Sequence, residues 1–163
     1  MKKHIVYIAL GTNLGDRRAN LRGALARFAP QVVVGAESHI YETAPWGYAD
    51  QPAFLNMVVE AETSLEPDAL LAFLKQIEQE MGREATFRNG PRLIDLDILF
   101  YDDLVLDSPP LVIPHPRLHE RAFVLVPLAD VAPDSLHPVL GETVLGLLMK
   151  IELGGIARFE GNL

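Results

Sequence analysis

The stretch from Gly90 to Tyr101 (GPRLIDLDILFY) constrains the fold more than any other part of the chain. It combines a Gly-Pro turn, a strand pattern and two carboxylates that lie two residues apart. A strand sends alternate side chains to opposite faces, so one set should form a core face: Ile94, Leu96, Ile98 and Phe100. The other set mixes two acids with apolar residues: Leu93, Asp95, Asp97, Leu99 and Tyr101. The pattern therefore predicts a strand whose second face forms the wall of a cleft.

Asp95 and Asp97 lie on the same side of this strand, roughly 6.5–7 Å apart along the chain. Carboxylates at that spacing suit one or two hard divalent cations, such as Mg²⁺ that also holds a polyphosphate. Three arginines just upstream, Arg83, Arg88 and Arg92, carry the planar guanidinium groups that suit phosphate. Together they favour phosphoryl transfer. Two solvated acids on the polar side of an antiparallel sheet would have the same spacing, and spacing alone leaves both interpretations open.

Composition excludes several classes of function. The 163 residues, 49% hydrophobic and 22% charged, fit one domain over residues 1–163. The absence of cysteine removes disulfides, thiolate metal sites and cysteine nucleophiles. A net charge of −8 opposes non-specific nucleic-acid binding, and no apolar run reaches the roughly 18 residues of a membrane span. We expect a cytoplasmic monomer with neither nucleic-acid nor membrane partners.

The rest of the chain alternates strand and helix patterns. The run from Lys3 to Leu10 is apolar on both faces and predicts a central strand. The stretch Gly11 to Asp16 supplies turn and capping residues, with too few glycines for a dinucleotide fingerprint. Further strands are expected within 31–43 and 54–62, and helices after Asp16, from Pro67 to Gly82, over 122–131 and over 143–151. The tail from Gly154 carries no clear signal.

Two aromatic residues are candidates for a flat ligand. Phe54 and Asn56 share the strand face opposite the core face, and an aromatic ring beside an amide would suit a heterocycle. Taken alone, this stretch fits a partly exposed phenylalanine and a turn-stabilising asparagine better. Trp46 lies in a Pro- and Gly-containing loop, Ala44 to Pro52, of a length often associated with function. It either covers an aromatic ligand or fills a gap in the nearby core. Both interpretations remain open.

His115 is a candidate for phosphate binding. It stands between Pro114 and Pro116, which hold it stiffly, and Arg117 and Arg121 follow within one or two helical turns. A single histidine often serves only as a structural hydrogen-bonding residue. Beside two arginines it would complete a pocket for phosphate.

Four segments together resemble the 6-hydroxymethyl-7,8-dihydropterin pyrophosphokinases of folate biosynthesis. In the order of that family they are YIALGTNLGDRRANL, SHIYETAPWGYADQPAFLNMVV, GPRLIDLDILFYDD and IPHPRLHERAFVLVPLADVAP, and they reach to about Pro133. The resemblance implies an α+β ferredoxin-like sandwich, with an antiparallel sheet covered by helices on one side. It also implies transfer of a pyrophosphoryl group from ATP to the hydroxymethyl group of 6-hydroxymethyl-7,8-dihydropterin, leaving AMP.

The resemblance assigns roles residue by residue. Asp95 and Asp97 would bind two Mg²⁺ ions, and Arg83 and Arg92 would stabilise charge on the transferred group. The implied pterin pocket consists of Thr43, Pro45, Trp46, Phe54, Asn56 and Phe123. The implied ATP contacts are Glu78, Arg83, Arg88, Arg92, His115, Arg121 and the backbone near Ile98, Leu111 and Val112. Asn89 and Pro116 depart from the family pattern, since some members have a tryptophan and a tyrosine there.

Overall fold

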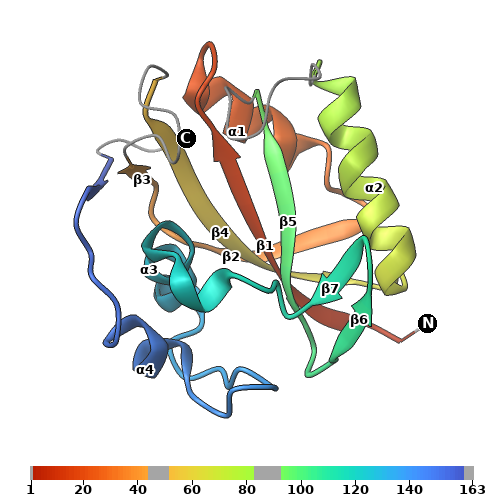
Figure 1. Ribbon diagram of the computed structural model, residues 1–163. Coiled ribbons are helices and arrows are strands. Elements are labelled where there is room, and N and C mark those ends of the chain that lie inside the picture. Colours follow the sequence, from red (N-terminus) through yellow and green to blue (C-terminus); the bar gives the residue numbers. More distant parts are fainter. Residues whose placement is uncertain (1, 44–51, 83–92, 160–163) are drawn as a thin grey trace.

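The computed structural model describes residues 2–43, 52–82 and 93–159 (Figure 1). Its centre is an antiparallel sheet of six strands within these ranges, in the order β5-β1-β4-β3-β8, with β2 also paired to β4. The strands are β1 (His4–Thr12), β2 (Val32–Glu37), β3 (Tyr41–Thr43), β4 (Phe54–Thr63), β5 (Asp95–Tyr101) and β8 (Ile156–Arg158). A separate hairpin pairs β6 (Leu106–Ser108) with β7 (Leu111–Ile113).

The helices are α1 (Arg17–Ala26), α2 (Pro67–Glu80), α3 (Ala122–Val131) and α4 (Val144–Leu148), with a short 3-10 helix at Leu118–Glu120. Their boundaries follow local signals: the Asp16 carboxylate caps α1 by accepting from Ala19 N at 3.1 Å. Pro67 begins α2, and Gly82 follows its end with a positive φ of 85°. No helix in the described ranges is long and apolar enough to cross a membrane.

Helices cover both faces of the sheet, whereas the sequence led us to expect them on one side. The first face, lined by Val6, Ile8 and Leu10 of β1, packs against α1 and α2. The second face, lined by Tyr7 and Ala9, packs against α3 and α4. In Figure 1, α3 lies over the sheet on the side towards the viewer. The apolar helix at 122–131 needs such a partner, because on the first face α1 and α2 already bury the core residues.

A bulge in β5 changes the predicted distribution of its side chains. Ile98 pairs with Ile8 and Phe100 pairs with Tyr7, so Leu99 is an extra residue in the ladder. A bulge of this kind reverses the alternation beyond it. Phe100 therefore packs on the second face and Tyr101 on the first, opposite to the prediction from a strict period of two. The Leu99 carbonyl accepts a hydrogen bond from His115 N at 3.1 Å, which joins β5 to the segment after β7.

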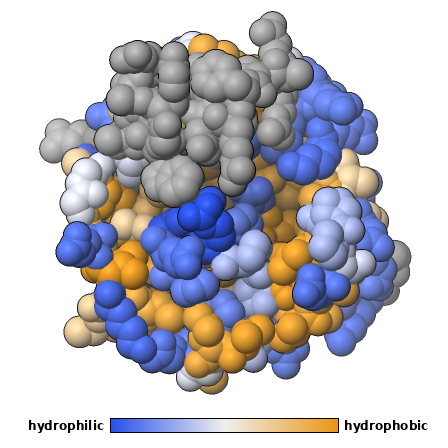
Figure 2. All heavy atoms as spheres, viewed as in Figure 1, coloured by the Kyte–Doolittle hydropathy of each residue, from blue (hydrophilic) through white to orange (hydrophobic). Residues whose placement is uncertain are grey.

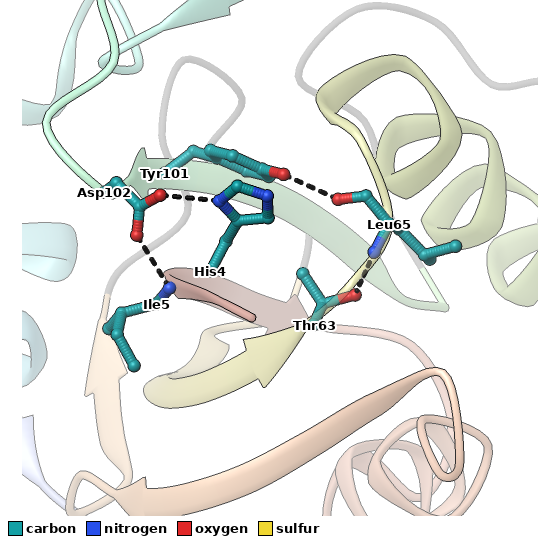
Figure 3. A network of polar contacts seen from close by, with 6 residues as sticks. All are labelled: His4, Ile5, Thr63, Leu65, Tyr101 and Asp102. Carbon is teal, nitrogen blue, oxygen red and sulfur yellow. Dashed lines mark hydrogen bonds and ion pairs between the residues drawn. The ribbon is translucent and has the colours of Figure 1, made fainter. Parts of the chain in front are cut away.

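A polar network closes the other end of β1 and β5 (Figure 3). The Asp102 carboxylate accepts from Ile5 N at 2.8 Å and lies 2.7 Å from His4 Nδ1. The Tyr101 hydroxyl donates to the Leu65 carbonyl at 2.6 Å, and burial raises the pKa of Tyr101 to about 12. Figure 3 shows the His4 ring lying between Asp102 and Tyr101. Asp102 itself has a φ of 49°, as the tight turn after β5 requires.

We expect Asp102→Asn to lower the free energy of unfolding by less than about 1 kcal/mol at pH 7, because an amide makes weaker hydrogen bonds to Ile5 and His4 and solvent screens this exposed site. Asparagine tolerates a positive φ, so the turn itself should persist. Burial opposes ionisation of Asp102, but the hydrogen bonds from His4 and Ile5 outweigh it and hold its pKa below 3.8. A lowered folded-state pKa gives stability that is present above the unfolded pKa and is lost as the pH falls through the folded pKa. Urea unfolding should therefore show the two proteins converging as the pH drops below 3.8, and a constant difference would contradict this assignment.

Candidate active site

The register of three strands brings the predicted acids beside the predicted heterocycle site. Gly11 of β1 pairs with Asn56 on one side and with Asp95 on the other. The adjacent row places Ala9 opposite Asp97. Side chains of paired residues point to the same face of a sheet. Asp95, Asp97 and Asn56 therefore share the second face, at the end of β1 that leads into α1.

Gly11 is a further functional candidate, which the sequence pattern does not indicate. That pattern predicts the start of a turn at Gly11, whereas β1 continues to Thr12. A methyl group at Gly11 would lie 2.9 Å from Asn56 Oδ1. Asn56 is only 7% exposed and its Nδ2 donates to Thr43 Oγ1 at 3.0 Å, so it cannot turn away without losing that bond. A glycine inside a strand pattern was the available signal.

The aromatic and polar residues of the predicted pterin pocket come from adjoining elements. Thr43 at the end of β3 pairs with Phe54 at the start of β4, so both lie on the second face with Asn56. Phe123 is the second residue of α3, half-buried against that face, and the Arg121 guanidinium carbon lies 5.5 Å from the centre of its ring. Because α3 packs against β3 and β4, Phe123 lies on the same side of the sheet as Thr43, Phe54 and Asn56.

Charged residues after β7 lie near Asp97. His115 N is held by Leu99, and His115 Nδ1 accepts from Arg117 N at 3.3 Å. Burial lowers the pKa of His115; Asp97 acts in the opposite direction, while Arg121 and Arg117 lower it further. The imidazole is therefore neutral at pH 7, with its proton on Nε2 because Nδ1 accepts.

Arg121 is half-buried and still carries its positive charge. Burial lowers the pKa of Arg121 below its ordinary value, Arg117 lowers it further, and Asp97 and Glu120 act in the opposite direction. Arginine nevertheless stays protonated in proteins. Figure 2 shows hydrophilic residues gathered in the middle of the view, with apolar surface below them. Two guanidinium groups and an imidazole N–H beside a carboxylate form an arrangement suited to a phosphate accompanied by a cation.

Glu78 supports the strand that carries the two acids. It lies at the end of α2, is only 1% exposed, and accepts from Leu96 N at 2.8 Å through Oε2. Lys75 Nζ lies 3.4 Å from the other carboxylate oxygen. Leu96 stands between Asp95 and Asp97, so Glu78 fixes the backbone between them. A contact between Glu78 and ATP stays a prediction.

We expect Glu78→Ala to reduce the free energy of unfolding by about 1–3 kcal/mol, because it leaves the Leu96 N–H without its acceptor in a buried place. The Leu96 amide should also exchange with deuterium faster than in the wild type, and Glu78→Gln should fall between the two. Lys75→Ala is the matched control, since it breaks the ion pair and leaves the Leu96 bond. Equal Leu96 exchange in Glu78→Ala and wild type would show that this bond does not order β5.

Asp95 and Asp97 fit a cation that is already coordinated by phosphate oxygens and water. No group of three or more His, Cys, Asp or Glu side chains in the described ranges is arranged to hold a metal ion. Mg²⁺ is often bound by one or two carboxylates, with phosphate oxygens and water completing its coordination. The two half-buried carboxylates therefore fit Mg²⁺ bound to a polyphosphate better than a metal held by protein alone.

The remaining predicted residues divide into two groups. Ile98 and Leu111 have side chains buried on the first face, which leaves only their backbone available to a nucleotide, and Val112 is half-buried in β7. Five lie outside the described residues: Pro45, Trp46, Arg83, Arg88 and Arg92. Their roles stay predictions.

Comparison with protein families gives one match over most of the chain. The family described as 7,8-dihydro-6-hydroxymethylpterin-pyrophosphokinase matches residues 7–133. A 2-amino-4-hydroxy-6-hydroxymethyldihydropteridine pyrophosphokinase of Methylorubrum extorquens is 46% identical over 156 residues, covering 94% of this chain and 98% of the relative. The enzyme of the same name from Bacillus subtilis is 51% identical over 130 residues, covering 78% of each chain.

Other relatives are much longer. A folic acid synthesis protein of Dictyostelium discoideum is 44% identical over 152 residues, which are 93% of this chain and 23% of that protein. A solved structure titled as HPPK-DHPS in complex with substrates has a TM-score of 0.74 at 18% identity, covering 91% of this chain and 43% of the other. This likeness supports the antiparallel sheet with packed helices, the α+β ferredoxin-like fold that the sequence predicted.

Proposed function

The chain belongs to the 7,8-dihydro-6-hydroxymethylpterin-pyrophosphokinase family, and on that premise we propose that it transfers pyrophosphate from ATP to 6-hydroxymethyl-7,8-dihydropterin, giving the pterin diphosphate and AMP for folate biosynthesis. One observation carries the proposal beyond family membership. Asp95 and Asn56 both pair with Gly11. The carboxylate that we assign to a phosphate-bound cation therefore lies across one intervening strand from the amide that we assign to the heterocycle. A transferase needs those two groups on one face and close together.

The proposed dihydropterin site uses Thr43, Phe54 and Asn56 from the sheet and Phe123 from α3, with Pro45 and Trp46 completing it. The Thr43 hydroxyl orients the Asn56 amide, whose oxygen and nitrogen match the donors and acceptors of a pterin edge. Phe54 belongs to β4 and Phe123 to α3, and both would offer ring faces for stacking the pterin. The substrate's hydroxymethyl group would then point across β1 towards Asp95.

In the proposed reaction the hydroxymethyl oxygen forms a bond to the β-phosphorus of ATP. The bond from that phosphorus to the oxygen bridging the α-phosphorus breaks, and its electron pair leaves with AMP. The hydroxyl proton passes to a base, a role that we assign to Asp97. The transfer needs in-line positioning and compensation of negative charge on phosphoryl oxygens, with no covalent intermediate on the protein.

Asp95 and Asp97 would hold Mg²⁺, two ions by the family resemblance, which when bound would offset charge on the triphosphate. His115 and Arg121 would hold phosphate oxygens through Nε2–H and the guanidinium group, and the neutral state of His115 leaves it a donor without a second positive charge. Arg83, Arg88 and Arg92 complete the proposed ATP site, with Arg83 and Arg92 acting on the transferred group. Glu78 and the backbone at Ile98, Leu111 and Val112 would lie along the nucleotide.

The test is AMP formation from ATP and Mg²⁺, measured with and without 6-hydroxymethyl-7,8-dihydropterin. We expect AMP and the pterin diphosphate in equal amounts, only when both substrates and Mg²⁺ are present. AMP or ADP released at the same rate without the pterin would indicate a nucleotide hydrolase. No turnover, with both ligands bound, would indicate a binding domain without catalysis. Either result would overturn the proposal.

A further inference from the structure

A single side chain holds both strand ends that carry the proposed pterin residues. Arg17, the first residue of α1, donates from one guanidinium nitrogen to Glu42 Oε2 at 2.7 Å and to the Ala53 carbonyl at 2.9 Å. Glu42 directly precedes Thr43 in β3, and Ala53 directly precedes Phe54 in β4. Thr43 and Phe54 are themselves paired. Arg17 therefore binds the residue before Thr43 and the residue before Phe54, the two paired residues of the proposed pocket.

Arg17 makes these contacts from the opposite side of the sheet. Tyr41 and Thr43 point to the second face, where the Tyr41 hydroxyl donates to Asp130 of α3 at 2.7 Å. Glu42 alternates with them and points to the first face, where α1 lies. Arg17 is thus separated from the pocket by the thickness of the sheet, so any effect on a ligand passes through the strands.

The connection that carries Arg17 is itself well ordered. Asn13 is fully buried and its Nδ2 donates to the Pro52 carbonyl at 3.0 Å, next to the bond from Arg17 to Ala53. Asn20 ties the connection internally, donating to Thr12 Oγ1 at 3.1 Å and to the Leu14 carbonyl at 2.7 Å. The hydrogen bonds to the carbonyls of residues 52 and 53 therefore come from Asn13 and Arg17, in an internally hydrogen-bonded segment that directly follows Gly11 and Thr12.

The C-terminal part of the chain adds a third contact. Strand β8 pairs with β3, placing Ala157 opposite Glu42, and Phe159 N donates to the Ile40 carbonyl at 2.8 Å. The Arg17 guanidinium carbon lies 5.8 Å from the centre of the Phe159 ring, within range of a cation–π interaction. The Arg17 side chain is one-quarter exposed, so Phe159 covers part of it.

We propose that Arg17 is a positioning residue for the dihydropterin pocket: it fixes Thr43 against Phe54 from behind the sheet, and Phe159 of the C-terminal segment holds its guanidinium in place. This inference rests on the proposed function of the same site. A guanidinium suits the task because its planar, rigid set of donors can bind a carboxylate and a carbonyl at once. The ATP site on β5 and after β7 has no contact with Arg17 in the described residues, so the effect should be selective for the pterin.

The test compares Arg17→Ala, Arg17→Lys and Phe159→Leu in the full chain by steady-state kinetics with each substrate varied. We expect Arg17→Ala to raise the KM for dihydropterin about tenfold, with the KM for ATP changed less than about twofold, since only the pterin residues lose their alignment. Arg17→Lys should recover part of the loss, because an ammonium can reach one of the two oxygens. Phe159→Leu should give a smaller rise of the same selectivity. Fluorescence titration with the pterin alone should show the same order of affinities.

Arg22→Ala is the matched control, because Arg22 lies on the same helix with an exposed side chain. It should leave both KM values unchanged. An unchanged pterin KM in Arg17→Ala, or an equal rise in the KM for ATP and for pterin, would overturn the inference. A melting temperature lowered without any change in pterin KM would show a purely structural role and overturn it too. Failure of the proposed function looks different, because the wild type itself would then form no AMP.

Discussion

Replacing Asp95 and Asp97 together by alanine should abolish pyrophosphoryl transfer, with a loss of at least about 10³-fold in kcat, the scale reported for removal of groups that stabilise transition-state charge. The two carboxylates share the second face at the Gly11 end of β1, where Asp97 also adjoins His115 and Arg121. Without them the triphosphate would bring several negative charges beside the substrate hydroxyl with no protein-bound cation to offset them. The double variant should show no stimulation by Mg²⁺ in the AMP assay.

The melting temperature of the same double variant gives an independent test. Asp95 and Asp97 repel each other but Asp97 also attracts Arg121, so the melting temperature of the double variant should be measured together with its activity, to distinguish lost chemistry from lost folding. Asp103→Ala is a suitable control, since this acid is exposed in the turn after β5. It should have wild-type activity. Retention of Mg²⁺-dependent turnover in the double variant would remove these residues from the mechanism.

Gly11→Ala should raise the KM for dihydropterin by about 10- to 100-fold, an effect of the size that a misplacement near 1 Å can produce. The added methyl group would lie 2.9 Å from Asn56 Oδ1, and Asn56 is buried and bound to Thr43. Asn56 must therefore shift, breaking the amide orientation that we assign to pterin binding. Steady-state kinetics with the pterin varied and direct titration of pterin binding would both measure the loss.

Gly154→Ala is the natural comparison, because no atom lies within 4 Å of the position its methyl group would take. It should bind pterin as the wild type does. If Gly11 acts through Asn56, the double variant Gly11→Ala with Asn56→Ala should bind pterin about as weakly as Asn56→Ala alone. Fully additive losses would mean that the methyl group blocks the ligand directly.

Much of the fold could be predicted because its signals are local. The structure contains the predicted strand β1, which is apolar on both faces, and the predicted helix at 122–131. It also has Asp16 as the cap of α1 and Pro67 at the start of α2. The bulge at Leu99 and the strand β8 could not be predicted in this way. The bulge depends on how β5 aligns with β1, and β8 consists of three residues that acquire a strand conformation by pairing with β3.

The candidate site shows the same division. Asp95, Asp97, Phe54 and Asn56 were identifiable because their chemistry stands out within an apolar strand. Gly11 and Arg17 were not, because a glycine after a strand looks like a turn and an arginine in a first helical turn looks like a solvated surface residue. The roles that we propose for Gly11 and Arg17 depend on a neighbouring residue across the sheet or behind it. These residues come close together only when the strands pair.

The strand that carries the acids also lies at an edge of the sheet, which bears on the solubility of the protein. Exposed edges offer unpaired backbone groups to other chains and promote edge-to-edge association. In β5 the outward backbone groups of Leu96 and Leu99 are already occupied, by the Glu78 carboxylate and by His115 N. The contacts that align the acids thus also protect this edge against intermolecular strand addition, so that a variant loosening Glu78 would expose the same strand to aggregation.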